Sequence, residues 1–212
     1  PEQAHFNNLL QIPFHVSPDD KNPILDVTFD GRHIMNSDIV SPSPEILITL
    51  KDENVFQLMN QISDTALFGV YLKDPSGNQV RIPFYDNNGN AIMQWFPADA
   101  NSKRFKIVYP AIFEQNGSYT LLVQGMDRSG NLSGDAEYKV SFRVIQESTI
   151  TSVLNYPNPF STSTKFVFTL TGNDTPDDIL IRIITPTGKV VREITEEEIG
   201  PIYIGRNITN FT

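Results

Sequence analysis

Three copies of one short motif carry the acidic and amide side chains that a metal ion would need. Each copy reads Asp-x-x-Gly-Asn, and the copies span residues 74–78, 86–90 and 127–131. Calcium takes several oxygen ligands from carboxylates, amides and carbonyls around one point. None of the copies has the alternating acidic spacing with a distal Glu that defines a helix–loop–helix calcium loop. If calcium binds in these motifs, Asp86 and Asp127 are the first candidates as its ligands.

The same motif also has a simpler interpretation as the turn of a β-hairpin. Asp at the first position can accept hydrogen bonds from the backbone that follows it, and Gly supplies the positive φ that such a turn requires. Each copy lies between two β-like segments. We therefore predict hairpin turns at all three places and no cofactor, with calcium as the alternative.

Other side chains with catalytic potential are sparse. The chain has no cysteine, which excludes thiolate nucleophiles, disulfides and Cys-ligated metals. His5, His15 and His33 lack a partner at metal-site spacing. The sequence also contains no Gly-x-Ser-x-Gly elbow, phosphate loop or dinucleotide fingerprint. We predict that this chain is not itself an enzyme and has no catalytic residue.

One aromatic cluster could contact a carbohydrate or a peptide. Trp95 adjoins Phe96, and Tyr85 lies in the preceding segment, so Trp95 and Tyr85 are the candidate ligand contacts. In a strand, successive side chains point to opposite faces, so only one of Trp95 and Phe96 can face the core. Trp95 as the core tryptophan of a sandwich is the favoured interpretation.

Composition narrows the possible partners. The 212 residues carry a formal net charge of −9 with a pI near 4.7. Nucleic acid binding needs clustered Lys and Arg, and an acidic surface suits anionic lipid poorly, so we expect neither as a partner. No apolar run approaches the ~20 residues of a membrane helix, which argues against membrane insertion. Because the chain begins at Pro1, we expect it to be a piece of a longer protein.

Short β-like segments recur between residues 22 and 148 and predict an immunoglobulin-like β-sandwich. They cover 24–29, 46–50, 68–72, 80–84, 92–96, 105–108, 119–123 and 138–145. Tyr119, at the head of its segment, is placed as the tyrosine corner of that fold. A helical turn or two is expected only within 54–63. Residues 1–21 are interpreted as an N-terminal strand or linker.

A polar break at 146–149 predicts a domain boundary, so a second sandwich is assigned to 149–212. Its expected strands are 166–170, 179–184 and 190–194, and the acidic run 196–198 is interpreted as a solvated loop. The fold class is thus all-β, with two tandem immunoglobulin-like sandwiches. Because too few strands remain to close the second one, we expect it to be truncated, with an open edge that pairs with another strand.

Tyr156-Pro-Asn-Pro-Phe160 is the most distinctive segment of the chain. Pro157 and Pro159 remove two backbone donors and favour extended backbone, so no helix can run through this arm. We interpret Tyr156, Pro157, Asn158, Pro159 and Phe160 as a stiff arm that restricts the orientation of the two sandwiches.

An arm of this kind opening a small sandwich resembles the C-terminal modules of bacterial type IX secretion cargo, which are related to FlgD-like immunoglobulin-type domains. The block 22–40, with 44–54, resembles the region that follows the catalytic domain in gingipain-related C25 peptidases. Those include sortase-like members of the same secretion system. The resemblance implies a secreted or outer-membrane-associated protein of Bacteroidetes whose catalytic Cys and His lie in another domain. Asp64-Thr65-Ala66 resembles an O-glycosylation acceptor of those bacteria.

These observations favour a non-catalytic accessory segment that acts as a spacer and recognition module and in type IX secretion sorting. Its implied partners are the neighbouring domains of the parent protein and the secretion or cell-surface machinery. The alternative is an adhesin-like module that binds carbohydrate or protein, which an outward-facing Trp95 would favour and a buried one would count against.

Overall fold

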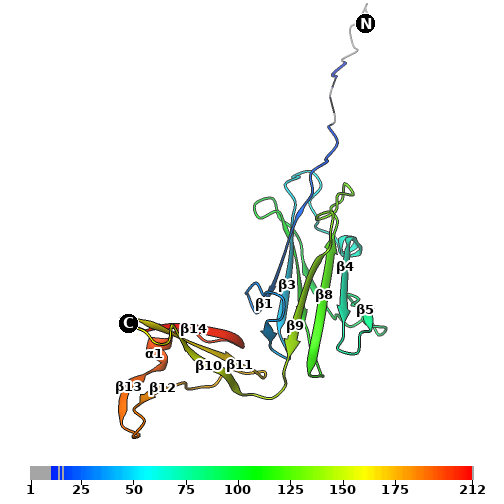
Figure 1. The fold of residues 1–212 in the computed structure, drawn as a ribbon. Coiled ribbons are helices and arrows are strands. Elements are labelled where there is room, and N and C mark those ends of the chain that lie inside the picture. The colour runs from blue at the N-terminus through cyan, green and yellow to red at the C-terminus, as the bar shows by residue number, and fades with distance from the viewer. Residues whose placement is uncertain (1–10, 14, 16, 212) are drawn as a thin grey trace, which may run out of the picture.

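The computed structural model describes residues 11–13, 15 and 17–211 and shows a nearly all-β protein (Figure 1). The first unit contains β1 (Ile24–Phe29), β2 (Ile39–Val40), β3 (Glu45–Lys51), the 3₁₀ helix η2 (Ile62–Leu67), β4 (Phe68–Lys73), β5 (Gln79–Arg81), β6 (Gln94–Phe96), β7 (Arg104–Pro110), β8 (Gly117–Gly125) and β9 (Tyr138–Val144). The second contains β10 (Ile150–Tyr156), β11 (Thr164–Leu170), β12 (Ile181–Ile184), β13 (Val190–Ile194), the helix α1 (Glu196–Ile199) and β14 (Gly205–Phe211). The all-β class is confirmed, and the two units share no sheet.

The first unit is a sandwich of two sheets. One has the strand order β1-β3-β7-β6 and the other β2-β9-β8-β4-β5, and all pairs are antiparallel except β2 with β9. Along β8 the almost fully buried Tyr119, Leu121 and Val123 alternate, as expected for a strand with one face on the core. Phe68 of one sheet stacks on Phe105 of the other with ring centroids 5.4 Å apart, so aromatic side chains join the two layers.

Tyr119 forms the tyrosine corner that its position predicts. Its hydroxyl donates a hydrogen bond of 3.1 Å to the carbonyl oxygen of Gln115, four residues upstream. The ring is 5 % exposed and packs against Phe113 and Phe142. This local link ties the start of β8 to the loop before it, which is the role of such a corner in immunoglobulin-like folds.

Two local predictions are wrong. The helix expected within 54–63 is largely missing: most of that stretch is irregular, and only its last two residues belong to η2, where Gln61 and Asp64 form a capping box. The acidic run 196–198 is not a loop but the body of α1, for which Thr195 and Glu198 form a second capping box. Both errors arise because capping side chains, not apolar periodicity, decide where these short elements start.

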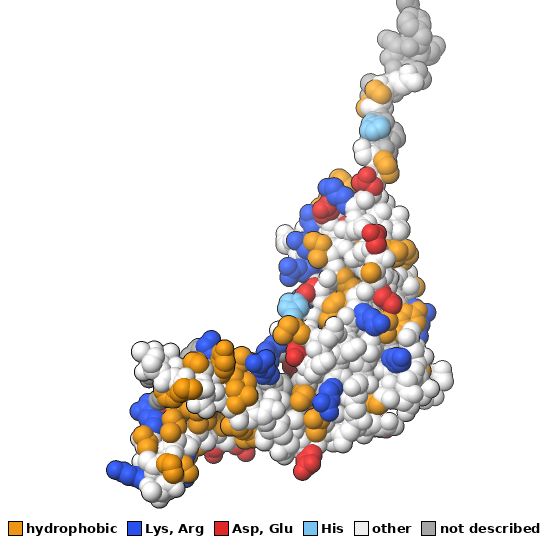
Figure 2. Space-filling view, viewed as in Figure 1, with side chains coloured by type: hydrophobic (Ala, Val, Ile, Leu, Met, Phe, Trp, Pro, Cys, Tyr) orange, Lys and Arg blue, Asp and Glu red, His pale blue; other side chains and the backbone are white. Residues whose placement is uncertain are grey.

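The second unit has little apolar core. Its three-stranded sheet has the order β10-β11-β14, and β12 pairs with β13 as a separate hairpin. Buried apolar side chains in the described part of this unit are Val167, Phe168, Leu170 and Ile194. Exposed apolar side chains gather on its surface (Figure 2). β10 and β14 lie at the edges of the sheet, and the expected pairing of an open edge with another chain stays a prediction.

The Tyr156–Phe160 arm does not join the two units, and the prediction that it does is wrong. It connects β10 to β11, and the hydroxyl of Thr164 in β11 donates a hydrogen bond of 3.0 Å to the Pro157 carbonyl. The link between the units is the stretch 145–149, which precedes β10. Tyr156 is 70 % exposed and Phe160 is 49 % exposed. A sorting role for the arm stays a prediction.

Candidate metal centre and the junction between the units

The three Asp-x-x-Gly-Asn copies form the same turn, which confirms the hairpin-turn interpretation. In each, one carboxylate oxygen of Asp accepts a hydrogen bond of 2.8–2.9 Å from the backbone N–H of Asn. The other oxygen accepts one of 2.8–3.1 Å from the Asn side chain. The glycines Gly77, Gly89 and Gly130 have φ between +85° and +94°, the left-handed conformation that favours Gly at this position.

The copies differ in what surrounds them. Asp74 and Asp86 are partly exposed, whereas Asp127 is completely buried. Asp127 lies in a group with Asp19 and Asp52, in which one carboxylate oxygen of each residue lies within 4.8 Å of the others. Within residues 11–13, 15 and 17–211, this is the only group of three His, Cys, Asp or Glu side chains placed to hold one ion. Asp86, the other sequence candidate, is outside it.

Three separate segments bring the acidic group together. Asp19 comes from the segment that leads into the first sandwich, Asp52 directly follows β3, and Asp127 belongs to the turn after β8. No sequence signal pointed to Asp19 or Asp52, because neither lies in a motif and they are far apart along the chain. The fold brings them together, because the C-terminal ends of β3 and β8 lie side by side, with the Leu50 side chain next to Gly125.

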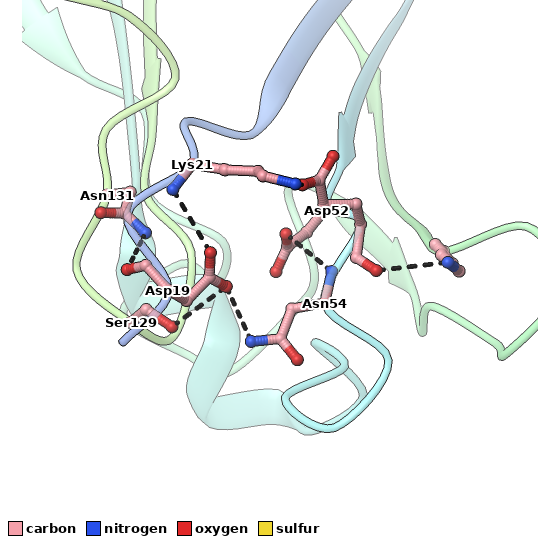
Figure 3. Close-up of polar contacts among 8 residues, drawn as sticks. Asp19, Lys21, Asp52, Asn54, Ser129 and Asn131 are labelled. Carbon is pink, nitrogen blue, oxygen red and sulfur yellow. Dashed lines mark hydrogen bonds and ion pairs between the residues drawn. The ribbon is translucent and has the colours of Figure 1, made fainter. Parts of the chain in front are cut away.

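Amide side chains bridge the members of the group (Figure 3). Asn54 donates its side-chain N–H to Asp19 at 2.7 Å and its backbone N–H to Oδ1 of Asp52 at 3.1 Å. Asn131 donates to the backbone carbonyl of Asp19 at 3.1 Å and to Oδ2 of Asp127 at 2.8 Å. Oδ2 of Asp52 is buried and accepts no hydrogen bond.

The electrostatics of the group are those of crowded carboxylates, of which Asp52 and Asp127 are buried and Asp19 is partly exposed. Burial raises the pKa of Asp52, and the nearby carboxylates of Asp127 and Asp19 raise it further. The pKa of Asp19 is lowered, mainly by the hydrogen bond from Asn54. Lys21 is close in sequence, but its ammonium group forms its ion pair with Glu53. The three carboxylates offer oxygen ligands, which are the donor set of a hard divalent cation.

Trp95 faces the core and not the solvent. It is half-buried and stacks on Phe105 with ring centroids 5.7 Å apart and an interplanar angle of 10°. Its neighbour Phe96 points outward and is 46 % exposed, and Tyr85 is 38 % exposed. Because its side chain faces the core, the position of Trp95 counts against a ligand-binding surface built on this residue. Ligand contacts by Trp95 and Tyr85 stay untested predictions, as does a glycan on Thr65, whose hydroxyl donates a hydrogen bond to the Ile62 carbonyl.

Several side-chain contacts join the two units beside the link. The guanidinium of Arg32 lies over the ring of Tyr203, 3.1 Å from its centroid. The hydroxyl of Ser41 donates to the side-chain oxygen of Asn173 at 3.2 Å, and Ser43 donates to the same oxygen. These contacts border a groove of about 710 Å³.

A glycine allows a close approach of the two backbones in this junction. Gly205, the first residue of β14, has a φ of +104°, and a β-carbon added there would lie 2.7 Å from the carbonyl oxygen of Ile39. No larger residue fits that distance without movement of the backbone. The two units are therefore joined by close noncovalent contacts as well as by the covalent link.

No helix in the described residues is long and apolar enough to span a membrane. No protein-family model and no curated protein matches the chain. Among solved structures, it is similar to dimeric latent PorU from Porphyromonas gingivalis, with a TM-score of 0.42 and 17% sequence identity. The alignment covers 96% of this chain and 18% of that one, so the chain spans less than a fifth of the length of that protein. At this TM-score the likeness carries no functional argument.

Proposed function

We propose that the chain is a non-catalytic accessory segment of a secreted or cell-surface bacterial protein, which holds neighbouring domains in a set orientation. The observation that supports this most is the junction of the two units. The link 145–149 alone would leave the units free to swing, but Thr171 donates a hydrogen bond to the Glu147 carbonyl at 2.6 Å, and Gly172 N–H donates to Ile145 at 3.1 Å. A link hydrogen-bonded to the second unit behaves as a spacer and not as a flexible tether.

The side-chain contacts across the junction add to this restraint. A cation over an aromatic ring contributes about 0.5–1 kcal/mol at an exposed site, and each hydrogen bond contributes a similar amount. The Arg32–Tyr203 stack and the Ser41–Asn173 hydrogen bond together therefore favour one orientation by about 1–2 kcal/mol, roughly two to three times thermal energy.

Gly205→Ala is expected to disrupt the junction, because its added methyl group would lie 2.7 Å from the Ile39 carbonyl oxygen. We expect a broader distribution of distances between spin labels attached to cysteines placed at the exposed residues Asn101 and Thr187, one in each unit. The matched control is Gly89→Ala, which also has positive φ but open space around it and lies away from both labels. Equal broadening in both variants, or in neither, would argue against the junction.

We further propose that residues 149–212, with the exposed Tyr156–Phe160 arm, take part in type IX secretion sorting. Fusion of the chain to a reporter enzyme, expressed in a bacterium that has this secretion system, tests the role. We expect export that falls several-fold when Pro157 and Pro159 are both replaced by Ala. Undiminished export of the variant, at equal folded protein, would refute the role of the arm.

A further inference from the structure

We propose that Asp19, Asp52 and Asp127 bind one Ca²⁺ ion, and that this ion fixes the segment 17–21 to the end of the first sandwich. The inference is independent of the spacer and sorting roles. It concerns a site that the Asp-x-x-Gly-Asn motif alone does not define, because two of the three ligands lie outside any motif.

The strongest observation is the unpartnered oxygen of Asp52. This residue is only 5 % exposed, and its Oδ2 atom accepts no hydrogen bond although the carboxylate faces Asp19 (Figure 3). A buried carboxylate oxygen without a partner is costly, and buried charges in proteins are ordinarily paired or coordinate a metal. A bound cation would satisfy this atom and balance the three negative charges together.

Another buried acid, Asp64, has the cationic partner that Asp52 lacks within the described part of the chain. Asp64 is 3 % exposed and receives two hydrogen bonds of 2.8 Å from the guanidinium of Arg128. Arg128 directly follows Asp127, yet its side chain pairs with Asp64 and not with the acidic group. Among the described residues, no ion pair includes Asp19, Asp52 or Asp127. The described residues thus supply an ion-pair partner for the buried Asp64 and none for the buried Asp52 and Asp127.

The chemistry of the group favours calcium over other divalent ions. Its donors are oxygens only, which suits Ca²⁺ or Mg²⁺ and not metals that prefer nitrogen or sulfur. Two ligands on opposite sides of Ca²⁺ lie about 4.6–5.2 Å apart, whereas around Mg²⁺ they lie about 4.0–4.2 Å apart. The three carboxylate oxygens lie within 4.8 Å of one another, a spacing that a Ca²⁺ ion can span.

A bound ion would change the segment that leads into the sandwich. Asp19 is held there by side-chain hydrogen bonds from Asn54 and, at 3.4 Å, from Ser129. Coordination would join the same carboxylate to Asp52 and Asp127, which are part of the rigid sandwich. Calcium would therefore set how the chain before residue 22 leaves the first unit.

Calorimetric titration of the chelator-treated 212-residue chain with CaCl₂ tests the site. We expect one ion per chain and an affinity that falls about tenfold or more in Asp19→Asn, because a charged ligand is lost. The control is Asp86→Asn, a change in an equivalent turn outside the group, which should leave the affinity unaltered. Asp19 lies before β1 and contributes to no strand, so its variant should fold normally.

Two further measurements distinguish calcium binding from a purely structural role of the three aspartates. Calcium should slow hydrogen exchange of the backbone amides in 17–21 and 52–54, and should raise the Tm by several degrees. Asp52→Asn should abolish that rise in Tm while making the calcium-free protein at least as stable as the parent, because it removes a buried unpaired charge. The proposal is overturned by no binding at millimolar CaCl₂, by equal binding in Asp19→Asn, or by Mg²⁺ binding as tightly as Ca²⁺.

Discussion

Phe105→Ala is expected to lower the free energy of unfolding of the first unit by about 3–5 kcal/mol. Phe105 is fully buried and stacks on Phe68 of the opposite sheet and on Trp95 of the neighbouring strand. Truncation removes both stacking contacts and leaves a cavity between the sheets that the rigid strands cannot collapse to fill. Urea unfolding followed by circular dichroism measures the change.

Phe96→Ala is the matched control, since Phe96 lies on β6 beside β7 but points outward and is 46 % exposed. Its loss should change stability by less than about 1 kcal/mol. A cost for Phe105→Ala no larger than that of the control would mean that the core does not lie between these two sheets. The single tryptophan adds a second probe, because its fluorescence should shift to the red as Trp95 loses its stacking partner.

Arg128→Met is the second substitution with a large expected effect, about 2–4 kcal/mol of destabilisation. Its guanidinium makes two hydrogen bonds with Asp64, and loss of the charge would leave a carboxylate buried without its cation. The Arg128 side chain is 27 % exposed, so the cost should fall toward the lower part of this range. Thermal and urea unfolding of the variant measure it.

The double variant Arg128→Met with Asp64→Asn separates loss of the pair from loss of packing. Without the buried charge, most of the lost stability should return, because replacing both partners is much less costly than removing one. A double variant as unstable as Arg128→Met alone would show that the arginine stem, and not the ion pair, stabilises this end of the sandwich.

The sequence predicted the first sandwich well because its strands carry apolar alternation and its turns carry Asp and Gly at fixed offsets. β14 went unpredicted for a physical reason. Its buried side chains include Asn207 and Thr209, so the strand shows no apolar alternation. Asn207 instead donates hydrogen bonds to the carbonyls of Tyr203 and Gly205, and these satisfy its buried amide. A polar residue of this kind is assigned to a loop when only apolar alternation is considered.

The candidate site was only partly visible in the sequence. Asp127 was named from its motif, but the same motif named Asp86 equally, and only burial distinguishes the two. Asp19 and Asp52 meet Asp127 only in the folded chain, which no local pattern encodes. The Pro157–Pro159 arm was misplaced for a similar reason, since a proline-rich segment indicates a restricted backbone but not which two elements it connects.

The distance distribution between spin labels at residues 101 and 187 tests the central claim most directly. The chain has no cysteine, so two introduced cysteines would be the only labelled positions. If the segment holds the two units in a set orientation, the parent protein should give one narrow peak in this distance distribution. A broad distribution, in a protein whose two units are both folded, would show that the units move independently and would contradict the spacer role.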